Sequence, residues 1–389
     1  MPYPARLLAA LGILWTSQAQ SQIDAPRVRI AEDLRLDASA EDFPAVTRVY
    51  VGPRGQIAVP IATDQQVRIY DTDGRKIAAF GRRGAGPGEF ASISFLGWKG
   101  DSIWVQDLRQ RRTTYIGADF KLLRTELWPG VDLQTTEPGR VGAFDPLALL
   151  PDGTWLGQGF ITTSDRNRRQ GALALRGADG SYRIVLRQLS DQDNPQLMLV
   201  AGFGRFVPFA LQTQYAFPSD GSRFGELAAP LPASERSHFT VTVFRATGDT
   251  VFSRRYEFRG VPISRSAKDS ALAAMLPRGG RVSEGPQDLP QRFQAIARDR
   301  MSNWYIPVET LTLGLDQTIW IGMRLTDAGR PYLILNGRGD PIGSVVLPRS
   351  SRVRQASATH IWVTETDDDG LTSVVRYRIE GLRCGAVPC

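Results

Sequence analysis

The sequence predicts an all-β protein, a six-bladed β-propeller with a helical insertion between blades 4 and 5. Three observations support this fold: a strand motif that recurs along the 389 residues, tight turns that join strands in pairs, and one interval with helical periodicity. Hydrophobic residues make up 42% of the chain and include 17 Phe and 8 Trp, which is enough for a substantial core. A disordered chain is therefore not expected.

The recurring motif is a turn followed by an alternating apolar strand that often carries Trp. Its six copies are RGQIAVP (54–60), KGDSIWV (99–105), DGTWLG (152–157), DGSRFGE (220–226), DQTIWIG (316–322) and ATHIWVT (358–364). Trp occupies the same place in four copies, and Ala58 and Phe224 take it in the first and fourth. Further strand pairs with Gly, Asp or Asn turns lie between the copies, so each copy belongs to a blade of roughly four strands. The Trp side chains are expected to pack blade against blade.

Ring closure is expected to involve the N-terminal strand. The last copy lacks an outermost strand, because the chain ends soon after residues 373–380. Residues 27–36 (RVRIAEDLRL) precede the first copy and have the pattern of a strand. We expect them to complete blade 6, since closure removes the exposed edges of the sheet.

The helical insertion spans residues 264–302. A first helix is expected to have Ser266 as its N-cap and to stop before Pro277, and a second helix is expected to start at Pro290. The insertion joins blades 4 and 5, so the sequence predicts that it lies over the same face as the other joins between blades.

The N-terminus has the pattern of a secretory signal peptide, residues 1–19. Arg6 precedes the apolar run LLAALGILW, and Ser17-Gln18-Ala19 fits the small-x-small pattern of a cleavage site after Ala19. The apolar run is too short to span a bilayer, so no membrane insertion is expected. The predicted mature propeller, residues 20–383, is expected to be a monomer in the periplasm or outside the cell.

Both cysteines, Cys384 and Cys389, lie in the C-terminal tail 384–389. In an oxidising compartment they are expected to form a disulfide that closes this short loop. Two thiols without a companion His or Cys do not make a zinc site.

Residues 79–125 carry the most specific pattern. FGRRGAGPGEF, followed by DSIWVQDLRQRRTTYIGADFKLLRT, resembles the NHL repeat, in which a glycine-rich segment precedes an apolar strand that ends in Asp. The resemblance implies a secreted bacterial six-bladed propeller, with peptide-amidating lyases and calcium-dependent lactonases among its enzymatic relatives. The lyases are implied to use metal-binding histidines, and this chain has only His238 and His360.

The glycine-rich stretch is not expected to bind phosphate. A Walker loop requires Gly-Lys-Ser/Thr before a helix, whereas Gly88-Glu89-Phe90 leads into another strand. The stretch is instead predicted to be the crossing between blades 1 and 2.

Arginine is the residue type that points to a ligand. The formal net charge is +7, and Arg greatly outnumbers Lys. In a propeller, the loops between second and third strands and the joins between blades emerge on one face. Arginines predicted there as ligand-binding residues are Arg82, Arg83, Arg109, Arg111, Arg112, Arg166, Arg168 and Arg169. The join RSSRVRQ adds Arg349, Arg352 and Arg354, and Glu309 is a candidate for the central channel.

Two functions remain open at this stage. Convergent guanidinium groups favour a non-enzymatic binding or scaffold module for a protein or an anionic glycan, with Trp or Tyr as stacking surfaces. The alternative is a metal-dependent, lactonase-like hydrolase or lyase with Ca²⁺ in the channel. No cofactor is predicted for the binding function, and the arginines also fit ordinary solvated loops in an Arg-rich protein. NHL propellers can bind RNA, but an exported chain without aromatic-basic stacking motifs is not expected to bind nucleic acid.

Overall fold

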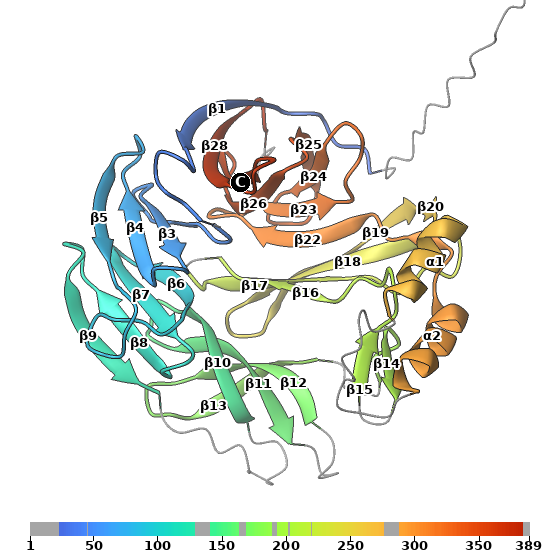
Figure 1. Cartoon of the computed structure of the whole chain (residues 1–389), viewed down its shortest axis with the longest axis horizontal. Coiled ribbons are helices and arrows are strands. Elements are labelled where there is room, and N and C mark those ends of the chain that lie inside the picture. The colour runs from blue at the N-terminus through green and yellow to red at the C-terminus, as the bar shows by residue number, and fades with distance from the viewer. Residues whose placement is uncertain are drawn as a thin grey trace, which may run out of the picture.

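The structure is a computed structural model that describes residues 23–44, 46–128, 141–162, 169–188, 193–200, 203–218, 220–275 and 288–383. Within this part of the chain, six four-stranded antiparallel sheets follow one another around a ring (Figure 1). The six-bladed β-propeller expected from the sequence is confirmed. The predicted signal peptide (1–19) and the tail with Cys384 and Cys389 lie outside the described residues.

The first strand of each blade is the innermost one, and the following strands lead outwards. Blade 1 contains β2 (Tyr50–Val51), β3 (Ile57–Ile61), β4 (Gln66–Tyr70) and β5 (Lys76–Phe80). Blade 2 contains β6 (Ile93–Lys99), β7 (Ser102–Asp107), β8 (Arg112–Ile116) and β9 (Leu122–Leu127). Blade 3 contains β10 (Val141–Leu149), β11 (Trp155–Thr162), β12 (Arg169–Arg176) and β13 (Tyr182–Arg187).

The second half of the ring repeats this order. Blade 4 contains β16 (Gln214–Ala216), β17 (Arg223–Ala228), β18 (Arg236–Arg245) and β19 (Thr250–Arg259). Blade 5 contains β22 (Val308–Leu313), β23 (Ile319–Met323), β24 (Arg330–Leu335) and β25 (Pro341–Leu347). Blade 6 contains β26 (Ser351–Ala356), β27 (His360–Thr366) and β28 (Thr372–Glu380).

The fourth strand of blade 6 comes from the other end of the chain. Strand β1 (Arg29–Leu36) pairs antiparallel with β28, from Arg29 opposite Glu380 to Leu36 opposite Val374. A bulge at Asp33 interrupts the pairing, and the Asp33 carboxylate lies 2.9 Å from Nε of Arg376 on β28. The N-terminal strand thus occupies the place expected for residues 27–36.

Hydrophobic clusters fill the interfaces between neighbouring blades. Trp320 of blade 5 packs with residues of blade 6, and Trp362 of blade 6 packs with residues of blade 1. Trp104 of blade 2 contacts Trp155 of blade 3 edge to face, at 5.1 Å between ring centroids. These four indoles are at most 7% exposed, which confirms that the recurring Trp residues are packing residues between blades.

Two helices lie between blades 4 and 5, as the sequence predicts. Helix α1 (Arg265–Ala273) has Ser264 as its N-cap, whose hydroxyl accepts a hydrogen bond from the Ala267 amide. The expected cap, Ser266, is wrong by two residues, because Ser264 has the extended backbone that an N-cap requires. Helix α2 (Leu289–Arg300) starts with Pro290 in its first turn, where a missing N–H costs no helical hydrogen bond.

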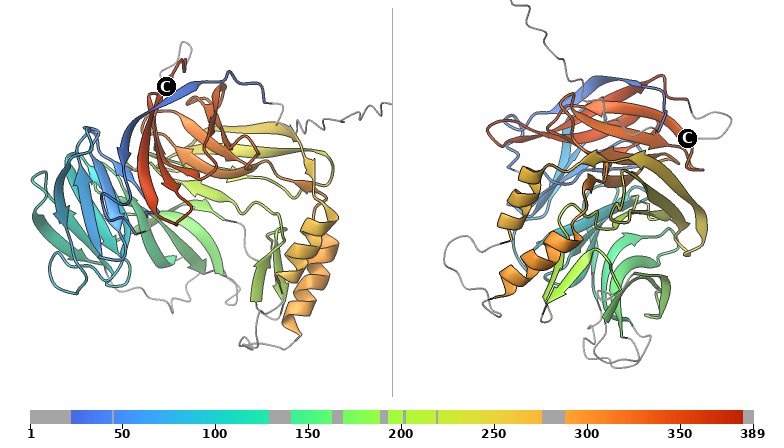
Figure 2. Two further views of the ribbon diagram at one scale, coloured as in Figure 1. Left: turned by 45° about the horizontal axis from the view of Figure 1, so that its top comes forward. Right: turned by 90° about the vertical axis from the view of Figure 1, so that its right-hand side faces the viewer.

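The helices pack on a hairpin that the sequence pattern does not reveal. Strands β14 (Leu197–Val200) and β15 (Phe203–Phe206) lie in the chain between blades 3 and 4, and β14 contacts α2. A separate hydrophobic cluster joins the hairpin to both helices, while β20 (Val261–Pro262) and β21 (Trp304–Tyr305) pair where the insertion begins and ends. Figure 2 shows helices and hairpin together beside the ring. No helix in the described part of the chain is long and apolar enough to cross a membrane.

Candidate functional site

The glycine-rich join between blades 1 and 2, residues 81–90, is a compact turn held by its own side chains. The Glu89 carboxylate accepts a hydrogen bond from the Gly86 amide at 2.8 Å and pairs with Arg82 at 2.7 Å. A Cβ atom at Gly84 would lie 2.1 Å from Oε2 of Glu89, so a side chain at this position would displace the Glu89 carboxylate. These contacts hold the pKa of Glu89 below its usual value, first through the Gly86 amide and then through Arg82.

Arg112 holds this join from blade 2. Its side chain is buried, and the guanidinium donates hydrogen bonds to the carbonyl oxygens of Ala85, Gly86 and Glu89 at 2.9, 2.9 and 2.6 Å. Backbone carbonyls therefore already occupy the Nη atoms of this predicted ligand-binding residue. Its role in the structure is to fix the join.

Asp107 and Gln110 complete the same network. The buried Asp107 carboxylate accepts hydrogen bonds from the amides of Ala91 at 2.6 Å and Gln110 at 2.9 Å. The Gln110 side chain in turn donates to the carbonyl of Gly84 at 2.6 Å. Asp107, which ends the strand, and Arg112 in the basic stretch after it belong to the pattern that resembles NHL repeats, and both serve the architecture of the join.

The other predicted arginines that the structure describes have separate surroundings. Arg82 is 80% exposed and pairs with Glu89, Arg83 donates to the Thr63 carbonyl, and Arg109 is exposed. Arg166 and Arg168 lie outside the described residues, and the side chain of Arg169 is not described. The helical insertion lies across the ring from blade 2 (Figure 1), so it does not cover the arginines of blades 1 and 2.

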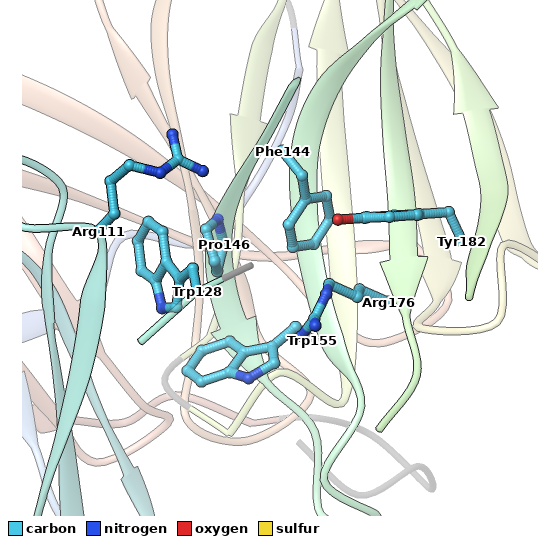
Figure 3. A pocket seen from close by; sticks show the side chains of 7 residues that line it. All are labelled: Arg111, Trp128, Phe144, Pro146, Trp155, Arg176 and Tyr182. Carbon is cyan, nitrogen blue, oxygen red and sulfur yellow. The ribbon is translucent and has the colours of Figure 1, made fainter. Parts of the chain in front are cut away.

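Arg111 differs from the others because it faces a cleft between blades 2 and 3. The cleft is open to solvent and shallow: it holds about 310 Å³ of empty space when the solvent at its mouth is included, but its cavity volume is only about 20 Å³. Its lining residues are Arg111, Trp128, Phe144, Pro146, Trp155, Arg176 and Tyr182 (Figure 3). We call it the interblade cleft.

The blade 2 wall of the interblade cleft is held by two hydrogen bonds. The Trp128 amide donates to the Arg111 carbonyl at 2.8 Å, and Trp128 Nε1 donates to the Thr113 hydroxyl at 2.8 Å. These bonds hold the indole beside the strand end from which Arg111 projects. Arg111 itself has a positive φ of 51°, which turns the chain at the start of β8.

On blade 3, glycine makes room for an aromatic ring. A Cβ atom at Gly157 would lie 2.5 Å from Cζ of Phe144, so the Phe144 ring covers this glycine. Phe144 then contacts the Tyr182 ring at 5.3 Å, while Pro146 lies at a bulge of β10, where a strand tolerates proline. Tyr182 is 41% exposed and is an accessible aromatic surface of the cleft, whereas Trp155 is 7% exposed and belongs to the packing between blades.

The two arginines of the interblade cleft form no ion pair within the described part of the chain. Arg176 acts on Asp179 only from a distance: the pKa of Asp179 is lowered chiefly by Ser181, and the charge of Arg176 is the smallest cause. Nε of Arg176 is also buried there without a hydrogen-bond acceptor. A buried donor without an acceptor is unfavourable, but this atom is shielded from solvent, so it does not face a ligand in the cleft. A guanidinium group beside aromatic rings is suited to an anion that also has a flat apolar face.

Sequence reasoning identifies Arg111 but misses Trp128, Arg176 and Tyr182. Nothing in their spacing links them, because they come from different blades and from opposite ends of strands. The one local signal is the position of Trp128, directly after a strand and outside the recurring Trp motif.

Acidic and metal-binding side chains do not gather in the described residues. There, no three His, Cys, Asp or Glu side chains are close enough together to hold a metal ion. Glu309, the carboxylate predicted for the channel, forms an ion pair with Arg330 at 2.7 Å.

Comparisons with known proteins support the fold. No family model and no curated protein sequence matches the chain. A member of the DUF4221 family from Bacteroides vulgatus matches with a TM-score of 0.51 and 12% identity, over 92% of this chain and all (100%) of that one. A protein from Bacteroides fragilis conjectured to be exported has a TM-score of 0.46 and 10% identity, over 93% and 97% of the two chains. The calcium-binding protein regucalcin from Agrobacterium tumefaciens has a TM-score of 0.40 and 13% identity, over 92% and 97%. At such identities the likeness concerns the propeller fold alone.

Proposed function

We propose that this propeller is a binding module that holds an anionic carbohydrate, such as a uronic acid or a sulfated sugar, in the interblade cleft. One observation carries the proposal: two arginines without an ion pair in the described chain share a cleft with the rings of Trp128, Trp155 and Tyr182. The module needs no catalytic group of its own.

The ligand class follows from the chemistry of these residues. A guanidinium group binds carboxylate or sulfate through two parallel hydrogen bonds, with a geometry that a lysine does not offer. Aromatic rings supply flat, rigid surfaces against which the apolar face of a sugar ring packs. A charged sugar uses both features at once, whereas a neutral sugar leaves the guanidinium groups without a partner.

The proposal also covers the compartment in which the protein binds its ligand. We infer export to the periplasm or the extracellular space from residues 1–19, and a monomeric chain. The resemblance of residues 79–125 to NHL repeats belongs to the same proposal, as a likeness to secreted propellers.

The test is calorimetric titration of the full mature chain with an oligogalacturonate. Arg111→Ala and Arg176→Ala should each weaken binding by about tenfold, since each removes a charge-assisted contact. Arg187→Ala is the matched control, because Arg187 is exposed on β13, the strand of Tyr182, and does not line the cleft. Equal affinities for all three variants would contradict the proposal.

A second experiment distinguishes the binding function from the alternative, a metal-dependent hydrolase or lyase. Melting of the purified chain is measured with and without EDTA, together with its metal content. The binding function predicts an unchanged melting temperature. A stoichiometric metal and a large decrease with EDTA would instead support a lactonase-like hydrolase or lyase.

A further inference from the structure

A second group of charged residues, four arginines and one glutamate, lies where blades 5 and 6 meet and on the segment that leads into blade 1. Its members are Arg48, Glu309, Arg330, Arg352 and Arg354, and we call it the channel cluster. The innermost strands β22, β26 and β2 contact one another in this order, and Arg330 joins them from the start of β24. Residues far apart in the sequence therefore meet there. This group is separate from the interblade cleft, which lies between blades 2 and 3.

Bulges place two members of the channel cluster. In β22 the pairing skips from Val308 to Thr310, which leaves Glu309 as the extra residue. In β26 the pairing skips from Val353 to Gln355, which leaves Arg354 as the extra residue. A bulge turns a side chain out of the regular alternation of the strand, and bulges are frequent beside binding sites.

A partly buried ion pair anchors the cluster. Nη1 of Arg330 lies 2.7 Å from Oε2 of Glu309, and the Arg330 side chain is only 7% exposed. The Nε atom of Arg330 is buried and has no hydrogen-bond partner in the described chain. Tyr332 follows Arg330 by two positions on β24. Its hydroxyl accepts a hydrogen bond from the amide of Val353 at 3.2 Å, which connects β24 to β26.

The remaining arginines are oriented by neutral partners. Arg354 donates from Nε to the Thr364 hydroxyl at 2.9 Å, and Arg352 donates to the carbonyls of Arg349 and Ser351 at 3.1 and 3.0 Å. Arg48 lies over the ring of Phe95, 4.4 Å from its centroid. Among the described residues, none of these three arginines forms an ion pair with a carboxylate.

The charges of the cluster act on one another. Burial lowers the pKa of Arg352 and the nearby Arg330 guanidinium lowers it further, while Tyr332 and the Glu309 carboxylate act in the opposite direction. Burial likewise lowers the pKa of Arg354. Tyr332 opposes this shift, and the charges of Arg352 and Arg48 add to it. Like charges kept this close repel one another unless an anion lies between them.

From these contacts we infer that the channel cluster is a second binding site, for a small oxyanion that carries two or more negative charges. Four arginines and one glutamate leave an excess of three positive charges. Arg352 and Arg48 are exposed and accessible to a ligand, whereas Arg330 and Glu309 form the base of the site. Glu309 limits the affinity, because its carboxylate competes with the ligand for Arg330.

The test is calorimetric titration of the full mature chain with citrate at low ionic strength, with acetate as the monovalent comparison. Citrate should bind with one-to-one stoichiometry and acetate at least about tenfold more weakly. Arg352→Ala and Arg354→Ala should each weaken citrate binding by about tenfold. Glu309→Gln should strengthen it by roughly threefold or more, since it frees Arg330. If the cluster had only a structural role, Glu309→Gln would not increase the affinity for citrate.

Two controls make the result decisive. Arg255→Ala removes one exposed arginine from β19 of blade 4 and should leave the affinity for citrate unchanged. Arg176→Ala, in the interblade cleft, should also leave it unchanged, so that failure of one site is distinguishable from failure of the other. Absence of citrate binding by the wild-type chain, or weaker binding by Glu309→Gln, would overturn the inference.

Discussion

Neighbouring arginines in one loop have opposite surroundings in this protein. Arg109 is exposed, whereas Arg112, three residues later, is buried against the carbonyls of the join between blades 1 and 2. The sequence presents both as basic residues of the same stretch, because nothing local shows which side chain reaches across to another blade. Arg112 is the first residue of the buried strand β8 and faces the glycine-rich join, whereas Arg109 lies in the turn before that strand.

Replacement of Arg112 by Ala should lower the free energy of unfolding by about 2–4 kcal/mol, because three carbonyls lose a charged donor. Arg109→Ala, the matched control, should change it by no more than about 0.5 kcal/mol. Denaturant unfolding of both variants and the wild type measures the difference. Equally small decreases in the free energy of unfolding of the two variants would show that the join does not depend on Arg112.

Glu89 should make the stability of the join sensitive to acid. The pKa of Glu89 in the folded chain is lowered from its ordinary 4.5, mainly by the Gly86 amide and then by Arg82. A lowered pKa means that the ionised carboxylate stabilises the folded state above pH 4.5 and that this contribution is lost as the pH falls through the folded pKa.

The measurement compares the wild type with Glu89→Gln, which keeps an acceptor but no charge. The wild type should be the more stable protein near neutral pH, and the difference should shrink on acidification below the ordinary pKa of Glu. A difference that stays constant with pH would contradict the role given to the carboxylate.

At the scale of strands and helices, the blades were predictable and the insertion only partly so. Strand periodicity, turn residues and the recurring Trp are local signals, and they locate the six blades and strand β1. The hairpin of β14 and β15 packs against α2, about a hundred residues away in sequence, and no local pattern indicates such a contact. The N-cap of α1 was missed by two residues because Ser264 and Ser266 have equal local preference, and backbone geometry decides between them.

Strand β1 should be essential for closure of the ring. A chain that starts at Asp37 lacks this strand, and the loss of buried Val28 and Leu36 alone should cost roughly 3–6 kcal/mol. A chain that starts at Ile23 is the control and should melt like the full mature protein. If the two truncated chains have the same melting temperature, β1 does not close the ring.

At the scale of the whole molecule, both proposed sites lie where neighbouring blades meet. The sequence predicts many arginines on loops and strand ends, but only ring geometry selects those that meet. Arg111 and Arg176 line one cleft at the interface of blades 2 and 3, and the charge of Arg330 acts on Arg352 across that of blades 5 and 6. Arg48 and Arg330 carry no sequence signal for binding, because their importance arises only when the ring is closed.

The central claim is that the interblade cleft recognises a charged sugar, and a fluorescence titration of the intact wild-type chain tests it most directly. Trp128 and Trp155 line the cleft and report on its occupancy. We expect an oligogalacturonate to change the tryptophan emission saturably, with an affinity that falls as salt is added. The same oligosaccharide with methyl-esterified carboxylates should bind at least about tenfold more weakly. Equal binding of both sugars, or no response to either, would contradict the account.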